Sequence, residues 1–259
     1  MALFPSQRLN AFKASIPSMK DGKEFNIYLK NSSNVNSPIL ETVMLDFNCL
    51  TRIIKKRENK QLEDLTILTP GVPGRVLIPQ EDAAFYVTLG ALLLYSKDQG
   101  TNMENIYGNL NLSHVLEKLK CFHCYFTKWA DPQFQSPGYK IIFEKNVLSS
   151  ETKRWEDLNS STTMKNIFPH QFLIESYEQT NFAHVIFANK DLGGGILGIG
   201  CLQEELYYCK APSLLVSKLI TSTLQDNEAV IVTNAYRFCR YTGFGYAFKY
   251  EAPEAELKS

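Results

Sequence analysis

The second half of the chain has the more regular pattern of hydrophobic and polar positions. Two apolar runs, His170–Ser176 and Phe182–Ala188, predict strands, and Ala229–Thr233 is a β-branched run typical of a buried strand. Pro212 is suited to begin a helix, and Ser213–Leu224 places its larger aliphatic residues on one side. The order of strand, loop, helix and strand predicts an α/β fold.

The first half is expected to be mostly helical. The segment Gln80–Lys97 has acidic residues in its first turn and a lysine at its end, which predicts a buried helix. Ser113 is expected to cap a second helix that reaches Lys120. The runs CFHCYF (121–126) and YKIIFEK (139–145) are expected to be strands.

Other segments are predicted to be irregular or extended. The prolines and glycines of residues 70–79 predict a linker, and the Ser, Thr and charge-rich residues 149–165 predict a loop. The alternating residues 25–29 predict a strand, and the last ten residues, 250–259, are expected to be a disordered tail.

Charge and composition narrow the function classes. The 259 residues include 27 basic and 27 acidic side chains, a balance that argues against general binding of nucleic acid. The run Lys55–Arg57 is interpreted as a solvated helix face in preference to a nuclear address. The N-terminus lacks the pattern of a secretory signal, and the apolar stretch Val87–Tyr95 is too short to cross a bilayer. We therefore expect an intracellular protein.

The six cysteines are expected to be reduced thiols. Cys121 and Cys124 have the spacing of half a zinc site. They lie in a strongly apolar run, however, and no second Cys/His pair follows at zinc-finger distance. Burial in the core is favoured, and no metal site is predicted.

The most informative motif is Gly193-Gly194-Gly195 followed, after seven residues, by Gln203-Glu204-Glu205. Consecutive glycines are expected to leave bare backbone amides that a ligand's phosphates can approach. Two adjacent carboxylates can hold and protonate a group attached to that phosphate, which suggests chemistry on a nucleotide-sugar. The alternative is an ordinary turn followed by a solvated Glu-Glu pair. The spacing does not fit the Rossmann or P-loop motifs.

These residues resemble the poly(ADP-ribose) glycohydrolase family, whose catalytic macrodomain carries a GGG-x(6–8)-QEE signature. Phe187–Lys190 resembles the family's FAN segment, and Tyr241–Phe244 resembles its YTGY turn. The resemblance implies a macrodomain-like mixed β-sheet flanked by helices. It also implies that residues 1–120 are a mainly helical accessory region, residues 121–250 a macrodomain core that is incomplete at its C-terminus, and residues 251–259 a tail.

The resemblance implies hydrolysis of the ribose–ribose O-glycosidic bond of poly(ADP-ribose), with release of ADP-ribose. Glu205 would be the general acid and then the base that activates water, while Glu204 would position the ribose. A partly dehydrated glutamate beside another carboxylate is expected to have a raised pKa. The residues implied to bind substrate are Glu175, Asn189, Gly193, Gly194, Gly195, Gln203 and Phe244. Among these, the glycine amides would hold the diphosphate.

The resemblance further implies poly(ADP-ribose), ADP-ribose and poly(ADP-ribosyl)ated proteins as partners, without direct contact with nucleic acid or membrane. A monomer that acts without a cofactor or metal, in the nucleus or cytoplasm and in the DNA damage response, is expected. The chain departs from the family pattern at Ile186, where an aspartate is common, and at Phe244, where a tyrosine is usual. It also ends at Ser259 without the family's later glycine-rich loop. A weak or inactive ADP-ribose-binding paralogue, and a fragment that offers only a binding surface, therefore stay open as alternatives.

Overall fold

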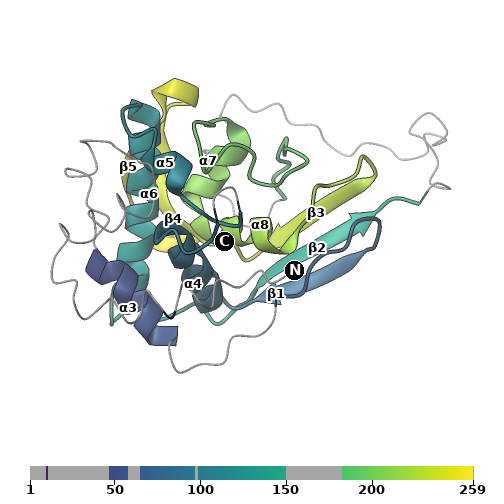
Figure 1. Ribbon diagram of the computed structural model, residues 1–259, viewed down its shortest axis with the longest axis horizontal. Helices are drawn as coiled ribbons and strands as arrows, with labels where there is room; N and C mark the ends of the chain where they lie inside the picture. Colours follow the sequence, from purple (N-terminus) through teal and green to yellow (C-terminus); the bar gives the residue numbers. More distant parts are fainter. Residues whose placement is uncertain (1–9, 11–46, 58–64, 97–98, 150–182, 259) are drawn as a thin grey trace.

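The computed structural model describes residues 10, 47–57, 65–96, 99–149 and 183–258 (Figure 1). Its helices are α3 (Phe47–Arg57), α4 (Gln80–Ala91), α5 (Glu104–Tyr107), α6 (Ser113–Ala130), α7 (Gln203–Lys210) and α8 (Ser217–Ile220), with 3₁₀ turns η5 (Pro212–Val216) and η6 (Gly245–Ala247). Its strands are β1 (Gly74–Ile78), β2 (Ile141–Val147), β3 (Glu228–Thr233), β4 (Arg237–Thr242) and β5 (Lys249–Lys258).

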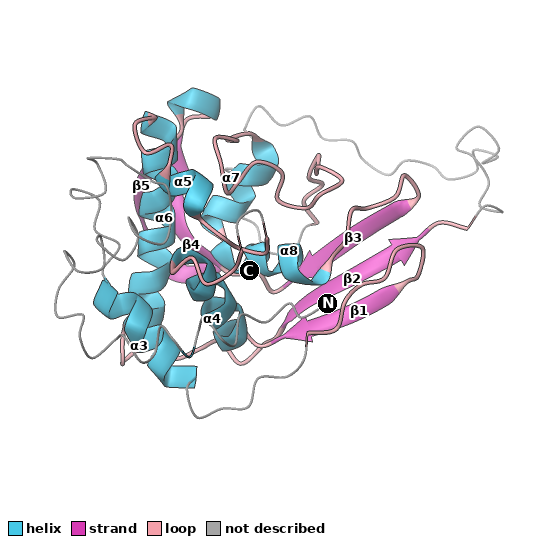
Figure 2. Ribbon diagram, viewed as in Figure 1, coloured by secondary structure: helices cyan, strands magenta, loops and turns pink. Residues whose placement is uncertain are grey.

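The strands form two antiparallel sheets with helices beside them, so the predicted α/β class is confirmed (Figure 2). The larger sheet has the order β1-β2-β3, and the smaller pairs β4 with β5. The larger sheet extends to one side of the molecule, most of the helices gather on the other, and α7 and α8 lie between them (Figure 1). A single parallel bridge, between Leu68 and Thr221, ties the end of α8 to the segment before β1.

Helix α6 is the central support of the helical side. It packs against α3, α4 and α7 and also against both strands of the smaller sheet. Residues 121–126, predicted as a strand, continue this helix, so that prediction is wrong. Val115, Leu119, Phe122 and Phe126 recur at intervals of three and four and are all buried, which is the spacing of one helix face. A six-residue apolar run taken alone cannot show that period.

Several other boundaries differ from the predictions. The expected linker 70–79 contains β1, and the expected disordered tail 250–259 contains all of β5 except its first residue. The helix that begins near Pro212 ends at Ile220, four residues early. Residues 183–188 have no regular secondary structure, although a strand was predicted there.

The remaining predictions are confirmed or untested. The helix that begins at Gln80 is present but ends at Ala91, before the predicted Lys97, and the strand in 139–145 is present. The run 229–233 is strand β3, but its predicted burial is wrong because every residue in it is at least partly exposed. The strands predicted at 25–29 and 170–176, and nearly all of the loop 149–165, lie outside the described residues. The division into residues 1–120 and 121–250 stays a prediction, and its boundary falls inside α6.

The cysteine predictions agree with the packing. Cys121, Cys209 and Cys239 are buried where α6, α7 and β4 meet, and Cys124 is partly buried. Burial raises the pKa of the Cys124 thiol to about 11, which keeps it a thiol at neutral pH. Within the described residues no cluster of His, Cys, Asp or Glu is arranged to hold a metal ion. No helix in this part of the chain combines the length and apolar character needed to span a membrane.

Gly90 lies in α4 directly against the backbone of Thr101. A Cβ at this position would overlap the backbone carbonyl group of Thr101, which cannot move aside without moving the main chain. We therefore expect Gly90→Ala to lower the free energy of unfolding by about 3 kcal/mol, despite the better helix propensity of alanine. Urea denaturation measures this change. Gly138→Ala is the control because nothing lies within 4 Å of its added Cβ, and equal stability of the two variants would contradict the expectation.

A buried ion pair joins β2 to β3. The Lys145 ammonium lies 3.1 Å from a Glu228 carboxylate oxygen, and both side chains are only 1% exposed. The N–H of Gln225 lowers the pKa of Glu228 most, followed by the N–H of Gly71, and Lys145 lowers it further. A carboxyl whose pKa is depressed by folding stabilises the protein above its unfolded pKa, and this contribution disappears as the pH falls through the folded pKa.

We therefore expect the stability of the unmutated protein to fall more steeply on acidification, from about pH 7 to about pH 3, than the stability of Glu228→Gln. Urea midpoints measured across this range test the expectation. Glu144→Gln is the matched control on β2, since its carboxylate is 46% exposed and lies 3.9 Å from Arg75. Parallel pH profiles for the unmutated protein and Glu228→Gln would contradict the account.

Candidate functional site

The glycine motif forms a loop that wraps around the first turn of α7. Residues 191–200 make successive turns, and Gln203, Glu204 and Glu205 begin the helix. Glu204 is 5% exposed and Glu205 is 8% exposed. Carboxylates are favoured at this end of a helix because unpaired N–H groups give it a partial positive charge. The interpretation of the Glu-Glu pair as a solvated surface feature is therefore excluded.

Glu204 is held by two backbone N–H groups from the loop. Its Oε1 accepts from Gly193 at 2.6 Å and its Oε2 accepts from Asn189 at 2.9 Å. Burial raises the pKa of Glu204 above its ordinary value, the two N–H groups lower it, and the charge of Glu205 raises it again. The net upward direction means that Glu204 binds a proton more readily than an exposed glutamate does.

Glu205 is held in the same way at the other end of the loop. Its Oε1 accepts from the N–H of Gly195 at 2.9 Å, and its Oε2 accepts from the N–H of Leu202 at 2.9 Å. Leu202 is the residue before the helix, so Glu205 also closes the first turn of α7 by reaching back to it. Each acid thus binds one residue of the glycine triplet: Glu204 accepts from Gly193, and Glu205 accepts from Gly195.

The expectation that the glycine amides are bare is wrong. Gly193 and Gly195 donate to the two glutamates, and Gly194 donates to the carbonyl of Asp191 at 2.9 Å. Glycine is needed here for a different reason. Gly194 has φ of +43°, and a Cβ there would lie 2.7 Å from Glu205 Oε1 and 2.9 Å from Glu204 Oε2. The triplet lets the backbone approach the carboxylates closely.

Gln203 and Asn189 organise the segment before the glycines. The amide of Gln203 accepts from the N–H of Phe187 at 3.0 Å and donates to the carbonyl of Val185 at 3.4 Å. This two-point contact clamps the segment to α7 without a β-ladder. The side chain of Asn189 is exposed and accepts from the N–H of Asp191 at 3.0 Å, which shapes the entry to the loop.

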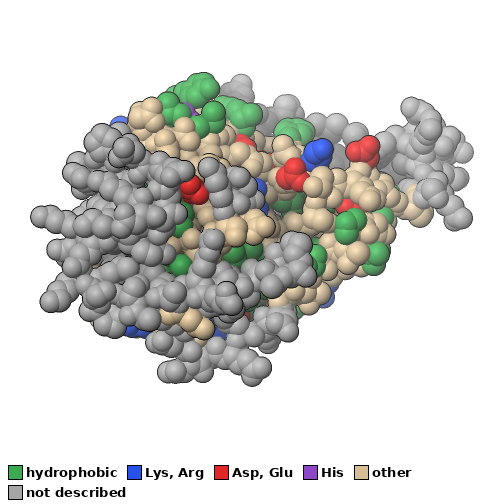
Figure 3. Space-filling model, in the orientation of Figure 1, with side chains coloured by type: hydrophobic (Ala, Val, Ile, Leu, Met, Phe, Trp, Pro, Cys, Tyr) green, Lys and Arg blue, Asp and Glu red, His purple; other side chains and the backbone are tan. Residues whose placement is uncertain are grey.

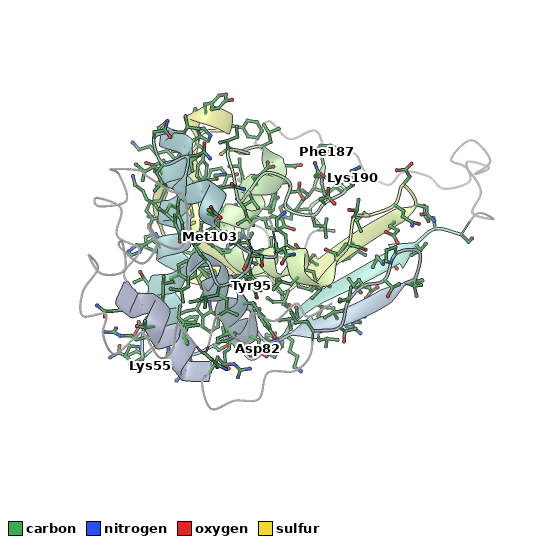
Figure 4. The ribbon with its side chains drawn as sticks, in the orientation of Figure 1. Lys55, Asp82, Tyr95, Met103, Phe187 and Lys190 are labelled. Atoms are coloured by element: carbon green, nitrogen blue, oxygen red, sulfur yellow. The ribbon has the colours of Figure 1, made fainter. Side chains whose placement is uncertain are left out.

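The rim of the site carries exposed apolar and basic side chains. Phe187 is 86% exposed, and Figure 4 shows it with Lys190 on the outer side of the loop, beyond α7. Leu202 is 62% exposed at the start of that helix. Hydrophobic side chains also gather along the edge of the molecule at which α7 and η6 lie (Figure 3). A ligand that covers the two acids would meet an apolar border.

The predicted Tyr241–Phe244 turn begins in the last two residues of β4, with Gly243 at φ of +75° and Phe244 47% exposed. Its neighbour Tyr246 packs against the ring of His114 at 4.9 Å, and Nε2 of His114 lies 3.0 Å from the carbonyl oxygen of Ile199. This chain of contacts brings the turn beside the far end of the glycine loop. Glu175, the remaining predicted site residue, lies outside the described residues.

Two lysines that sequence reasoning missed complete the site. Lys218 donates to the carbonyl of Gly194 at 3.4 Å, and burial lowers its pKa while Glu204, Asp191 and Glu205 raise it. Lys118 of α6 is fully buried and donates to carbonyl groups of the loop. Neither position stands out in the sequence, since each is one lysine within an ordinary amphipathic segment.

The arrangement places two buried acids, the buried ammonium of Lys118 and the partly buried ammonium of Lys218 around one loop. Such a pair of carboxyl groups can supply a proton to a departing oxygen and a negative charge to a developing cation, which glycoside cleavage requires. Fold and site together thus define a carboxylate-pair site on an α/β scaffold. The site is suited to acid–base chemistry on a sugar linkage.

Comparison with known proteins agrees with this class. Residues 152–258 match the family described as "Poly (ADP-ribose) glycohydrolase (PARG), Macro domain fold". The chain is 25% identical to Poly(ADP-ribose) glycohydrolase 1 of Arabidopsis thaliana over 280 aligned residues, which cover 100% of this chain and 50% of that protein. It is 29% identical to Poly(ADP-ribose) glycohydrolase 1 of Caenorhabditis elegans, over 81% of this chain and 26% of the relative. It is 34% identical to Poly(ADP-ribose) glycohydrolase 2 of the same organism, over 52% of this chain and 27% of the relative.

These findings agree with the resemblance carried by the motifs, and the match to the poly(ADP-ribose) glycohydrolase family, with its macro-domain fold, covers residues 152–258. The chain spans half, or less, of the length of these relatives. The matched range contains every residue that the motifs single out, including the glycine triplet and both glutamates.

Proposed function

We propose that the chain hydrolyses the ribose–ribose O-glycosidic bond of poly(ADP-ribose) and releases ADP-ribose. The observation that carries this proposal is the pair of buried glutamates, whose four carboxylate oxygens each accept a backbone N–H from the loop or its flanks. Fixed acids in a partly dehydrated site are the machinery of glycoside cleavage. The similarity to proteins named as poly(ADP-ribose) glycohydrolases supplies the substrate class.

In the proposed reaction Glu205 gives a proton to the ribose oxygen that leaves. The bond between that oxygen and the anomeric carbon breaks, and the sugar passes through an oxocarbenium-like state. Glu205 then takes a proton from water as the water oxygen bonds to the anomeric carbon. Glu204 positions the ribose.

The other predicted contacts remain part of the proposal. The glycine triplet would let the diphosphate lie close to the backbone because no Cβ intervenes, although its N–H groups already have acceptors in the protein. Asn189 would contact ribose hydroxyls, Phe244 would cover the diphosphate, and Glu175 would contact the adenine. Gln203 would act mainly by holding the segment that carries Phe187.

A second candidate function is binding of ADP-ribose without turnover. It is favoured by Ile186, an apolar residue in the segment that enters the loop, where the family commonly has an aspartate that can accept a ribose hydrogen bond. A third is a surface that recognises a protein partner. The second candidate binds ADP-ribose at the site but does not hydrolyse the polymer. The third requires neither ADP-ribose binding nor hydrolysis.

One experiment separates the three functions. Purified chain is incubated with automodified polymer, monomeric ADP-ribose is measured, and calorimetry with ADP-ribose is run on the same sample. Release of ADP-ribose supports the proposed hydrolase. Heat of binding without product over a long incubation would replace it with the binding module, and absence of both from a folded sample would leave only the partner surface.

A further inference from the structure

Lys118 is a buried cation whose ammonium group donates three hydrogen bonds to the loop that includes and follows the glycine triplet. Its side chain is inaccessible, and Nζ donates to the carbonyl oxygens of Ile196 at 3.0 Å, Gly198 at 2.6 Å and Gly200 at 2.8 Å. A lysine ammonium has three N–H donors, and here each has its own acceptor. The loop residues 196–200 thereby form a closed turn around one positive charge.

This closed turn is the part of the loop that lies against Glu205. The N–H of Gly200 donates to the carbonyl of Gly195 at 3.1 Å, and a Cβ at Gly200 would lie 2.8 Å from Glu205 Oε1. The two N–H groups that hold the carboxylate, from Gly195 and Leu202, flank this turn on either side. If the turn opens, both donors move away from the carboxylate together.

We propose that Lys118 is a positioning residue for Glu205. It acts through the loop and does not touch substrate, and its catalytic consequence rests on the proposed hydrolase function. The residue belongs to α6 and lies outside the matched segment 152–258. The helical first half of the chain therefore fixes the acid that the second half carries.

The charge of Lys118 adds to its geometry. Burial lowers the pKa of Lys118, while the nearby Cys209, Cys201 and Glu205 raise it. A buried ammonium persists only when carbonyl groups and negative charge compensate for its lost hydration. The loop carbonyl groups, the Lys118 ammonium and the Glu205 carboxylate therefore stabilise one another. Without the lysine, the three carbonyl oxygens lose their donor and Glu205 loses a nearby positive charge.

Lys118→Met, which keeps most of the length of the side chain and removes the ammonium group, tests the proposal. The matched control is Lys120→Met on the same helix, whose exposed ammonium forms a surface pair with the neighbouring Glu117 at 2.6 Å. Two quantities are measured: amide hydrogen exchange in residues 193–202 relative to the core of α4, and the rate of ADP-ribose release. Lys118→Met should speed exchange at Gly195 and Leu202 and lower kcat by about 10²-fold with a small change in KM, whereas the control should change neither.

The outcomes separate this inference from the proposed function. If the unmutated chain releases no ADP-ribose, the hydrolase proposal fails while the exchange measurement still decides whether Lys118 positions the loop. Unchanged loop exchange in folded Lys118→Met, or faster exchange spread equally over loop and core, would overturn the positioning role. If the methionine variant does not fold, Lys118→Gln, which leaves a neutral N–H donor at the site, is judged by the same criteria.

Discussion

Replacing Glu205 with glutamine should lower the rate of ADP-ribose release by at least about 10²–10⁴-fold, which corresponds to about 3–5 kcal/mol in the barrier. The proposed reaction needs a proton on the departing ribose oxygen, and glutamine cannot supply one. The effect should appear in kcat, because the proton is transferred only as the bond breaks. Steady-state kinetics on polymer of defined length measure it.

Two comparisons separate the loss of the proton donor in Glu205→Gln from any effect of the substitution on packing. Glutamine at this position turns one carboxylate oxygen into an N–H donor that faces the N–H of Gly195 or Leu202, so near-native stability of the variant must be verified. A substrate with a good leaving group, such as the p-nitrophenyl glycoside of ADP-ribose, needs little acid assistance and should recover most of the lost rate. Glu251→Gln on the exposed part of β5 is the control. A folded Glu205→Gln variant that retains the rate on polymer would show that Glu205 is not the acid.

Replacing Gly194 with alanine should remove most of the activity and destabilise the protein. The added Cβ would lie 2.7 Å and 2.9 Å from the oxygens of Glu205 and Glu204, so at least one carboxylate must move. A displacement of about 1 Å in a catalytic group is enough to cost about 10²-fold in rate. The left-handed φ adds a cost of about 1–2 kcal/mol for a residue with a Cβ. Polymer kinetics and urea denaturation measure the two effects.

Gly198→Ala in the same loop is the matched control. Its Cβ would meet only the carbonyl oxygen of Gly195, at 3.7 Å, which is ordinary contact. It should therefore keep both activity and stability close to those of the unmutated protein. Equal behaviour of the alanine variants at 194 and 198 would indicate that the approach of the loop to the carboxylates has no functional role.

The sequence predicted which residues come together at the site better than it predicted the hydrogen bonds between them. Gly193–Gly195 and Glu204–Glu205 were identified from residue type and spacing, and the structure does bring them together. The predicted role of the glycine N–H groups was wrong. They were expected to be free for a ligand, whereas those of Gly193 and Gly195 donate to the two carboxylates. Each donor and acceptor in a tight loop can find its partner inside the protein, and spacing alone does not say which pairing forms.

Long-range packing explains the rest of what sequence did not predict. Lys118 lies about eighty positions before the loop that it closes, and nothing local distinguishes it from exposed lysines such as Lys120. The final strand β5 was missed because its charged, proline-containing sequence has little strand propensity. Its pairing with β4 and its contacts with α6 outweigh that preference.

The most direct test of the proposed roles of Glu205 and the glycine triplet is a crystal structure of the chain bound to ADP-ribose. We expect the terminal ribose to lie within hydrogen-bonding distance, about 3 Å, of the Glu205 carboxylate, with the diphosphate against Gly193–Gly195. ADP-ribose bound away from the first turn of α7, or a ribose separated from both glutamates, would contradict the claim.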